Sequence, residues 1–244
     1  MKPAIKVLGV PDDINSSFMR GSSAAPPLIR EALYSASSNL FSESGLNLDQ
    51  KGIWEDLGDI EFEGEVAVEN FKKIKTFVKD VLVSNQKLVS LGGDHSVSWP
   101  ILDAHLDKWD ALDILHIDAH PDLYDSLLGN KLSHASPFAR IMETGRVSRL
   151  VQVGIRTLNK HQREQAEKFG VEIYQMKDLS KLSSLSFSKP VYCSIDIDAL
   201  DPAYAPGVSH FEPGGLSTRQ LIDCLNGFKG RLIGADIVEY NPKR

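Results

Sequence analysis

The chain has 244 residues, 42% of them hydrophobic and 25% charged, which suits one large α/β domain with its own core. Its net charge of −6 and the lack of a basic tract argue against nucleic acid as a partner. No apolar run approaches the length of a membrane span, and the first residues lead directly into a strand-like run without a signal peptide. We therefore expect a cytoplasmic protein that does not act on a membrane, unless an organellar transit peptide has been removed from it.

Strand-like and helix-like segments alternate along the chain. We expect strands at residues 6–10, 53–57, 86–91, 112–117, 150–155, 171–175, 192–197 and 231–238. We expect helices at residues 26–36, 65–83, 97–106, 134–143, 161–169 and 217–227. Several of these strands are almost continuously apolar, which is typical of a parallel sheet with helices on both faces. No linker or repeat divides the chain, so we predict one α/β domain over residues 1–244.

Side chains with metal-ligand chemistry follow three of the expected strands. Asp118, His120 and Asp122 come directly after the strand at 112–117. Alternate residues of an extended chain point to one side, so these three side chains are expected to converge, and Pro121 argues against a helix there. The carboxyl ends of parallel strands, where ligands bind, lie at one edge of the sheet. The candidate ligands at that edge are His95, Asp118, His120, Asp122, Asp196 and Asp198.

These six residues would bring two imidazoles and four carboxylates together. Their negative charges need compensation when buried, and two divalent cations would supply it. Such a ligand set suits Mn²⁺, with Fe, Co, Ni and Zn as alternatives. Two metals can share a water and turn it into a nucleophile near neutral pH, so the pattern predicts metal-assisted hydrolysis. Taken alone, Asp196 and Asp198 are more often part of a turn or a cap, and His116 is predicted to be a core histidine.

Three segments resemble the signature segments of the ureohydrolases, the arginase and agmatinase family. They are Gly-Gly-Asp-His-Ser at 92–96, Asp-Ala-His-x-Asp at 118–122 and Ser-x-Asp-x-Asp-x-x-Asp-Pro at 194–202. Further segments look most like plant-type arginases, and they lie at 15–18, 129–136, 153–156 and 209–215. The resemblance covers essentially the whole chain. It implies a three-layer α/β/α sandwich around an eight-stranded parallel sheet, with two Mn²⁺ per chain.

The resemblance also implies a role for each site residue. One metal would be bound by His95, Asp118, Asp122 and Asp196, and the other by Asp118, His120, Asp196 and Asp198. A hydroxide that bridges the two metals would attack the guanidinium carbon of the substrate, with Asp122 orienting it. His134 would act as general acid or proton shuttle toward the leaving amine. Glu239 would pair with the guanidinium group, and His210 would lie on the substrate side.

The loop after Asp122 is where substrate choice is expected. Asn130 and Ser126 would donate to an α-carboxylate and Asp125 would meet an α-ammonium group, although all three also suit an ordinary polar loop. The resemblance implies a small cationic guanidino substrate, L-arginine, that is cleaved to urea and L-ornithine. The alternative is agmatine, cleaved to urea and putrescine, or another guanidino compound.

The resemblance leaves two other classes of protein to weigh. One is a deacetylase with an arginase-like fold and a single Zn²⁺, and the other is a non-catalytic regulatory relative. Members of the family are usually homo-oligomers, which implies a trimer or hexamer here. Relatives continue past the Asn-Pro at 241–242, so the domain is expected to lack the family's C-terminal helix.

Overall fold

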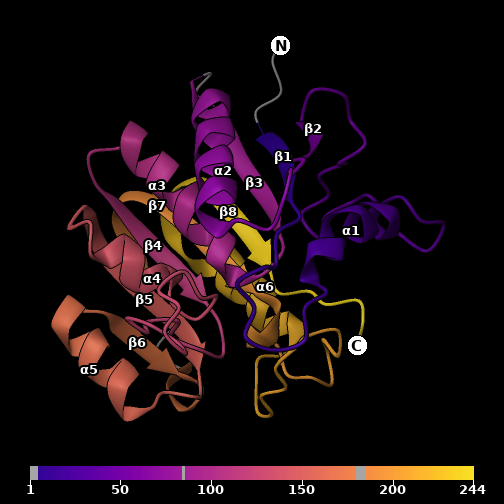
Figure 1. The fold of residues 1–244 in the computed structure, drawn as a ribbon. Coiled ribbons are helices and arrows are strands. Elements are labelled where there is room, and N and C mark those ends of the chain that lie inside the picture. Colours follow the sequence, from indigo (N-terminus) through magenta and orange to yellow (C-terminus); the bar gives the residue numbers. More distant parts are fainter. Residues whose placement is uncertain (1–4, 84–85, 180–184) are drawn as a thin grey trace.

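The sheet is the framework that positions the site. The computed structural model describes residues 5–83, 86–179 and 185–244. Within these residues the strands are β1 (Ile5–Val10), β2 (Trp54–Asp59), β3 (Lys87–Gly92), β4 (Leu112–Ile117), β5 (Val147–Ile155), β6 (Glu172–Gln175), β7 (Ser186–Asp196) and β8 (Lys229–Val238). They form one eight-stranded sheet in the order β2-β1-β3-β8-β7-β4-β5-β6, and every neighbouring pair is parallel (Figure 1). The predicted eight-stranded parallel sheet is therefore confirmed.

Helices cover both faces of this sheet. Those in the described residues are α1 (Ala25–Leu33), α2 (Ala67–Leu82), α3 (Ser98–Lys108), α4 (Pro137–Met142), α5 (Lys160–Phe169) and α6 (Thr218–Gly227). Neighbouring residues of β4 point to opposite faces, which gives the domain two cores. Ile114 packs in one core with Ile74 of α2 and Ile101 of α3. Leu115 packs in the other core with Leu221 of α6. In Figure 1, α2 lies in front of the sheet.

Several element boundaries differ from the prediction: the strand expected at 150–155 begins at Val147, for example, and the helix expected at 26–36 ends at Leu33. Two further differences have a cause that can be read in the sequence. The helix expected at 134–143 begins only at Pro137, whose fixed φ suits the first helical position, so His134 lies on the turn before the helix. The strand expected at 192–197 already begins at Ser186, which pairs with Lys229 of β8. Its first five residues are Ser-Phe-Ser-Lys-Pro, in which Phe187 is the one large apolar residue, and the register shifts between Ser186 and Pro190. The apolar pattern therefore marked only the continuously buried part of the strand.

The strand order explains why the candidate ligands meet. The four central strands lie in the order β3-β8-β7-β4, all with their carboxyl ends at the same edge. His95 follows β3, Glu239 follows β8, Asp196 ends β7 and Asp118 follows β4. Each of the four neighbouring strand ends therefore delivers one of the chemically important side chains to this edge.

The helices can also be compared with what a membrane-spanning segment requires. None of those in the described part of the chain combines the length and the apolar character that crossing a bilayer requires.

Candidate metal centre and substrate cavity

The first group of predicted ligands surrounds His95. Its Nδ1 lies 3.1 Å from Asp118 Oδ2, 3.0 Å from Asp122 Oδ2 and 3.2 Å from Asp196 Oδ2. This nitrogen is fully buried, yet it makes no well-oriented hydrogen bond with any of the three carboxylates. One nitrogen and three oxygens that converge without satisfying one another are the donor set of a bound cation. The residues present therefore fit a metal ion at this position.

The second group surrounds His120. Its Nδ1 lies 3.0 Å from Asp198 Oδ2 and 3.5 Å from Asp118 Oδ1. One ligand atom from each of these three residues lies within 4.8 Å of the others, so the group also fits a metal ion. Asp118 belongs to both groups, because its Oδ2 faces His95 and its Oδ1 faces His120. The structure thus brings all six predicted ligands together around two adjacent positions that share Asp118.

The charges of this cluster are poorly compensated by the protein itself. Burial and the charge of Asp198 raise the pKa of Asp196 well above its ordinary value. Burial opposes protonation of His95, but the contacts with three carboxylates outweigh it and raise the pKa of this imidazole. The raised pKa values of Asp196 and His95 both indicate an excess of buried negative charge around them, which divalent cations would relieve.

Buried partners orient the His95 ring through its other nitrogen, Nε2. Its Nε2 lies 3.0 Å from the hydroxyl of Ser194, which donates to Asp236 Oδ1 at 2.5 Å. Tyr192 donates to the other oxygen of Asp236 at 2.9 Å. This chain of contacts leaves Nδ1 of His95 facing the carboxylates. Residues that orient a metal ligand in this way are characteristic of metal sites.

His116 is buried as predicted, but it is also part of the site. Its Nε2 lies 2.7 Å from Asp118 Oδ2, and Gln152 lies 3.0 Å from its Nδ1. The ring stacks on Phe138 with centroids 3.8 Å apart, and Phe138 also meets the edge of His95 at 5.3 Å. The sequence pattern correctly indicated burial but carried no signal for the contact with Asp118.

Phe138 therefore packs between the hydrophobic core and the site histidines, and removing its side chain is expected to destabilise the fold. The side chain is fully buried, so Phe138→Ala should lower the free energy of unfolding by about 3–5 kcal/mol. Chemical denaturation of the metal-free protein measures this loss. Phe41→Ala, at a phenylalanine that is 56% exposed, is the control and should change stability little. Equal losses in the two variants would contradict the packing described here.

Glu239 and His134 form a second buried pair beside the metal-ligand cluster. Glu239 Oε1 accepts the backbone N–H of His95 at 2.9 Å and lies 2.9 Å from His134 Nδ1. The other ring nitrogen of His134 lies 2.9 Å from the hydroxyl of Ser17. Burial opposes protonation of His134, but the charge of Glu239 outweighs it and raises the pKa to about 9. His134 is therefore protonated at neutral pH.

Two of the site residues have left-handed backbone conformations. Asp122 has φ of 49° and Glu239 has φ of 65°, in a region that non-glycine residues seldom adopt. The backbone N–H of Glu239 donates to Gly93 O at 2.9 Å, which ties the end of β8 to the end of β3. Such conformations are kept where the surrounding structure enforces them, and they cluster at functional sites.

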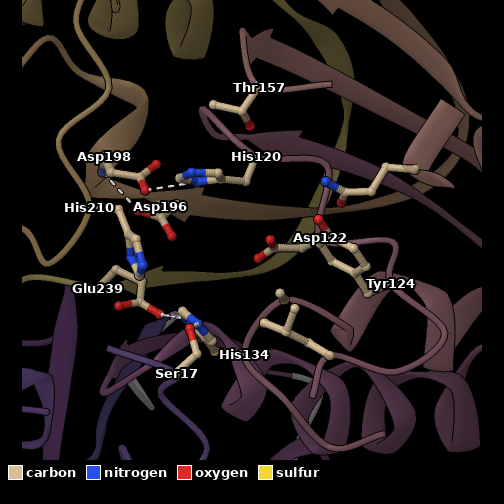
Figure 2. A pocket seen from close by; sticks show the side chains of 13 residues that line it. Ser17, His120, Asp122, Tyr124, His134, Thr157, Asp196, Asp198, His210 and Glu239 are labelled. Carbon is tan, nitrogen blue, oxygen red and sulfur yellow. Dashed lines mark hydrogen bonds and ion pairs between the residues drawn. The ribbon is translucent and has the colours of Figure 1, made fainter. Parts of the chain in front are cut away.

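A cavity of about 200 Å³ opens beside both groups. It is lined by Ser17, His120, Asp122, Tyr124, Leu127, His134, Ala135, Thr157, Gln162, Asp196, Asp198, His210 and Glu239. Figure 2 shows His120, Asp196 and Asp198 on one side and Ser17, His134 and Glu239 on another, with His210 between them. None of the described lining residues is Lys or Arg, whereas four are acids. The cavity therefore suits a small cation.

The predicted substrate loop meets this cavity through other residues than those expected. Tyr124 and Leu127 line it, whereas Asp125, Ser126 and Asn130 are not among its lining residues. Asp125 is exposed and pairs with the His161 ring at 3.0 Å. Asn130 is exposed and donates to Asn15 Oδ1 at 3.3 Å. His210 does line the cavity, and its role on the substrate side, like the roles of the loop residues, remains a prediction.

Sequence reasoning missed several lining residues, chiefly Ser17, Thr157 and Gln162. Ser17 lies in a segment that resembles plant-type arginases, which is the one signal that pointed to it. Thr157 lies just after β5 and Gln162 lies in the first turn of α5, and neither periodicity nor a charge pattern marks a site there.

Comparisons with known proteins agree with this geometry. A model described as "Arginase family" matches residues 3–244. Arginase 2, chloroplastic/mitochondrial, of Arabidopsis thaliana is 47% identical, with 100% of this chain and 75% of the relative covered. An agmatinase of Bacillus cereus is 33% identical, with 98% and 83% covered. The structure of arginase from Medicago truncatula superposes with a TM-score of 0.95 at 46% identity, covering 99% of this chain and 80% of that one.

Proposed function

The chain belongs to the arginase family and is an arginase-type amidinohydrolase, and we propose that it hydrolyses L-arginine to urea and L-ornithine with two Mn²⁺. The observation that carries the metal proposal is the position of Asp118, whose two oxygens face two separate imidazole and carboxylate groups. The choice of arginine rests on the plant arginases, which are 46–47% identical over nearly the whole chain, against 33% for the agmatinase. Family membership also favours this hydrolase over a single-zinc deacetylase or a non-catalytic relative.

The proposed ligand sets follow the two groups. One Mn²⁺ would be held by His95, Asp118, Asp122 and Asp196, and the other by Asp118, His120, Asp196 and Asp198. Two cations bound there would lower the pKa of a water they share and so supply a nucleophile at neutral pH. Asp122 lines the cavity and would orient that nucleophile by accepting its hydrogen.

Glu239 would position the substrate. Its buried carboxylate lines the cavity, and a planar guanidinium cation pairs strongly with a carboxylate in such a water-poor site. Its contacts with His95 N–H and His134 hold the carboxylate in one orientation. The guanidinium carbon would thereby be placed for attack by the nucleophile.

His134 would complete the reaction by supplying a proton. Water adds to the guanidinium carbon, the bond from that carbon to the side-chain nitrogen of arginine breaks, and this nitrogen leaves as an amine that needs a proton. His134 lines the cavity, is protonated at neutral pH and is held between Ser17 and Glu239. It is therefore placed to act as the general acid.

The test of the proposal is urea release by the Mn²⁺-loaded protein from arginine and from agmatine. We expect kcat/KM to be at least about 10-fold higher for arginine, because hydrogen bonds to the α-carboxylate are charge-assisted and contribute about 1.5–3 kcal/mol each. A preference for agmatine would replace the proposed activity with that of an agmatinase.

A loop variant sharpens this comparison. Asn130→Asp places a negative charge where the sequence predicts contact with the α-carboxylate. It should lower kcat/KM for arginine and leave the value for agmatine, which has no carboxylate, nearly unchanged. A matched change at Asn39, on the exposed loop after α1, serves as the control. Unchanged arginine kinetics in Asn130→Asp would remove this residue from the proposed contacts.

Two further proposals concern the whole protein. We propose a homo-oligomer, trimer or hexamer, which light scattering of the purified protein would measure. The cytoplasmic location stays a prediction, and the Arabidopsis relative is described as chloroplastic or mitochondrial.

A further inference from the structure

The two histidines of the metal-ligand cluster have different partners on their outer nitrogens. His95 Nε2 contacts the Ser194 hydroxyl, a neutral group in the fully buried interior. His120 Nε2 lies 3.3 Å from Glu212 Oε1, a carboxylate whose side chain is 33% exposed at the rim of the site. No role was predicted for Glu212 from the sequence. The contact joins residues 92 positions apart in the chain.

This contact decides which nitrogen of His120 is free to bind a cation. A neutral imidazole carries one proton, and the nitrogen without it is the ligand. Nδ1 of His120 faces Asp118 and Asp198, so it must be the unprotonated nitrogen when a metal is bound. Nε2 then carries the proton and donates a hydrogen bond to the Glu212 carboxylate. A carboxylate in this place also strengthens the imidazole as a ligand.

The loop that carries Glu212 is held firmly relative to the ligands. Arg156 donates from Nη2 to Glu212 O at 2.6 Å and to Asp198 O at 2.7 Å, so one guanidinium connects the two backbone segments. The carboxylate of Asp201 accepts the N–H of Gly214 at 2.7 Å and closes the loop. A side chain at Gly215 would meet Arg156 Nη2 at 2.7 Å, so this packing requires glycine. Glu212 is therefore presented to His120 by a rigid support.

We propose that Glu212 is a positioning residue for His120, which fixes the ring and its tautomer so that Nδ1 binds the cation shared with Asp118 and Asp198. The inference rests on the metal centre of the proposed function. The two cation positions then differ in the residues that support their histidine ligands. The position at His120 depends on a partly exposed carboxylate, whereas the position at His95 depends on the buried Ser194 and Asp236.

Mn²⁺ titration of the metal-free protein by calorimetry tests this inference without any substrate. Wild type should bind two Mn²⁺. Glu212→Ala should weaken one of them about 10–100-fold and leave the other unchanged, which is the usual effect of removing the partner of a ligand histidine. Glu212→Gln keeps an acceptor oxygen and should lose less. Glu31→Ala, an exposed glutamate of α1, is the control and should match wild type.

Electron paramagnetic resonance gives a second readout. Two Mn²⁺ that share Asp118 should be magnetically coupled in wild type, and Glu212→Ala at the same Mn²⁺ concentration should show mainly the uncoupled single-ion spectrum. Once His120 is replaced by alanine, a further Glu212→Ala change should have no additional effect on Mn²⁺ affinity. Wild-type affinity at both positions in Glu212→Ala, or additive losses in the double variant, would overturn the inference.

These outcomes are separable from the fate of the proposed function. A wild-type protein that binds two Mn²⁺ but releases no urea would refute the proposed activity and leave the role of Glu212 standing. Normal urea release together with full Mn²⁺ affinity in Glu212→Ala would do the reverse. Thermal unfolding of each metal-free variant verifies that the exchanged side chain has not altered the fold.

Discussion

Asp118→Asn is expected to reduce urea release more than any other single change in this protein. Asp118 Oδ2 faces His95 and His116, and its Oδ1 faces His120, so one carboxylate serves both proposed cation positions. Asparagine keeps the shape but removes the charge and turns one acceptor into a donor. Losing several kcal/mol of electrostatic stabilisation corresponds to a fall in kcat of more than about 10³-fold.

Metal analysis should show the cause of this loss. We expect Asp118→Asn to retain less than the two Mn²⁺ of wild type after dialysis, while its thermal unfolding without metal stays close to wild type. The matched control is Asp113→Asn. Asp113 is a buried aspartate of β4, the strand that leads to Asp118, and its carboxylate accepts the Lys189 N–H at 3.2 Å at the strand end away from the site. Full Mn²⁺ content with normal urea release in Asp118→Asn would refute the proposed metal centre.

His134→Asn is expected to have the second largest effect and a different signature. The imidazole is proposed as the general acid, and removing such a group costs about 10²–10⁴-fold in rate. Because His134 contacts Glu239 and Ser17 and is not a proposed metal ligand, Mn²⁺ content should stay at the wild-type level. Steady-state kinetics with arginine, combined with metal analysis of the same sample, measures both quantities.

The contact between His134 and Glu239 supplies the control for this prediction. Their side chains lie 2.9 Å apart, so the losses in His134→Asn and Glu239→Gln should be less than additive in the double variant. A small loss in kcat for His134→Asn, or a loss of Mn²⁺ with it, would assign the histidine a role other than proton donation.

Local sequence signals were sufficient for the elements and for the kind of chemistry. Apolar strands alternating with amphipathic helices determine a covered parallel sheet, because such strands are stable only when both faces are buried. The alternation of Asp118, His120 and Asp122 predicted three ligands on one side of an extended chain. The three side chains do lie near one another, but the backbone bends at residues 119–120 and is left-handed at Asp122. The helix start was misjudged at 134–143, because the apolar and polar pattern does not distinguish a turn ahead of Pro137 from the helix that follows.

The pairing of distant residues was decided only by the tertiary structure. The strands that end at or just before His95, Glu239, Asp196 and Asp118 are neighbours because the sheet order is β3-β8-β7-β4, and no local pattern encodes that order. The same holds for Ser17 beside His134 and for Glu212 beside His120, which are 117 and 92 residues apart.

The sequence by itself therefore identified the candidate cation ligands, since ligand chemistry and residue spacing are local properties. Only the tertiary structure decided how Asp118 divides its two oxygens between His95 and His120. It also decided which group contacts the outer nitrogen of each imidazole, the Ser194 hydroxyl for His95 and the Glu212 carboxylate for His120. These are distances between separate strands and loops, and they exist only once the sheet has brought the strand ends together.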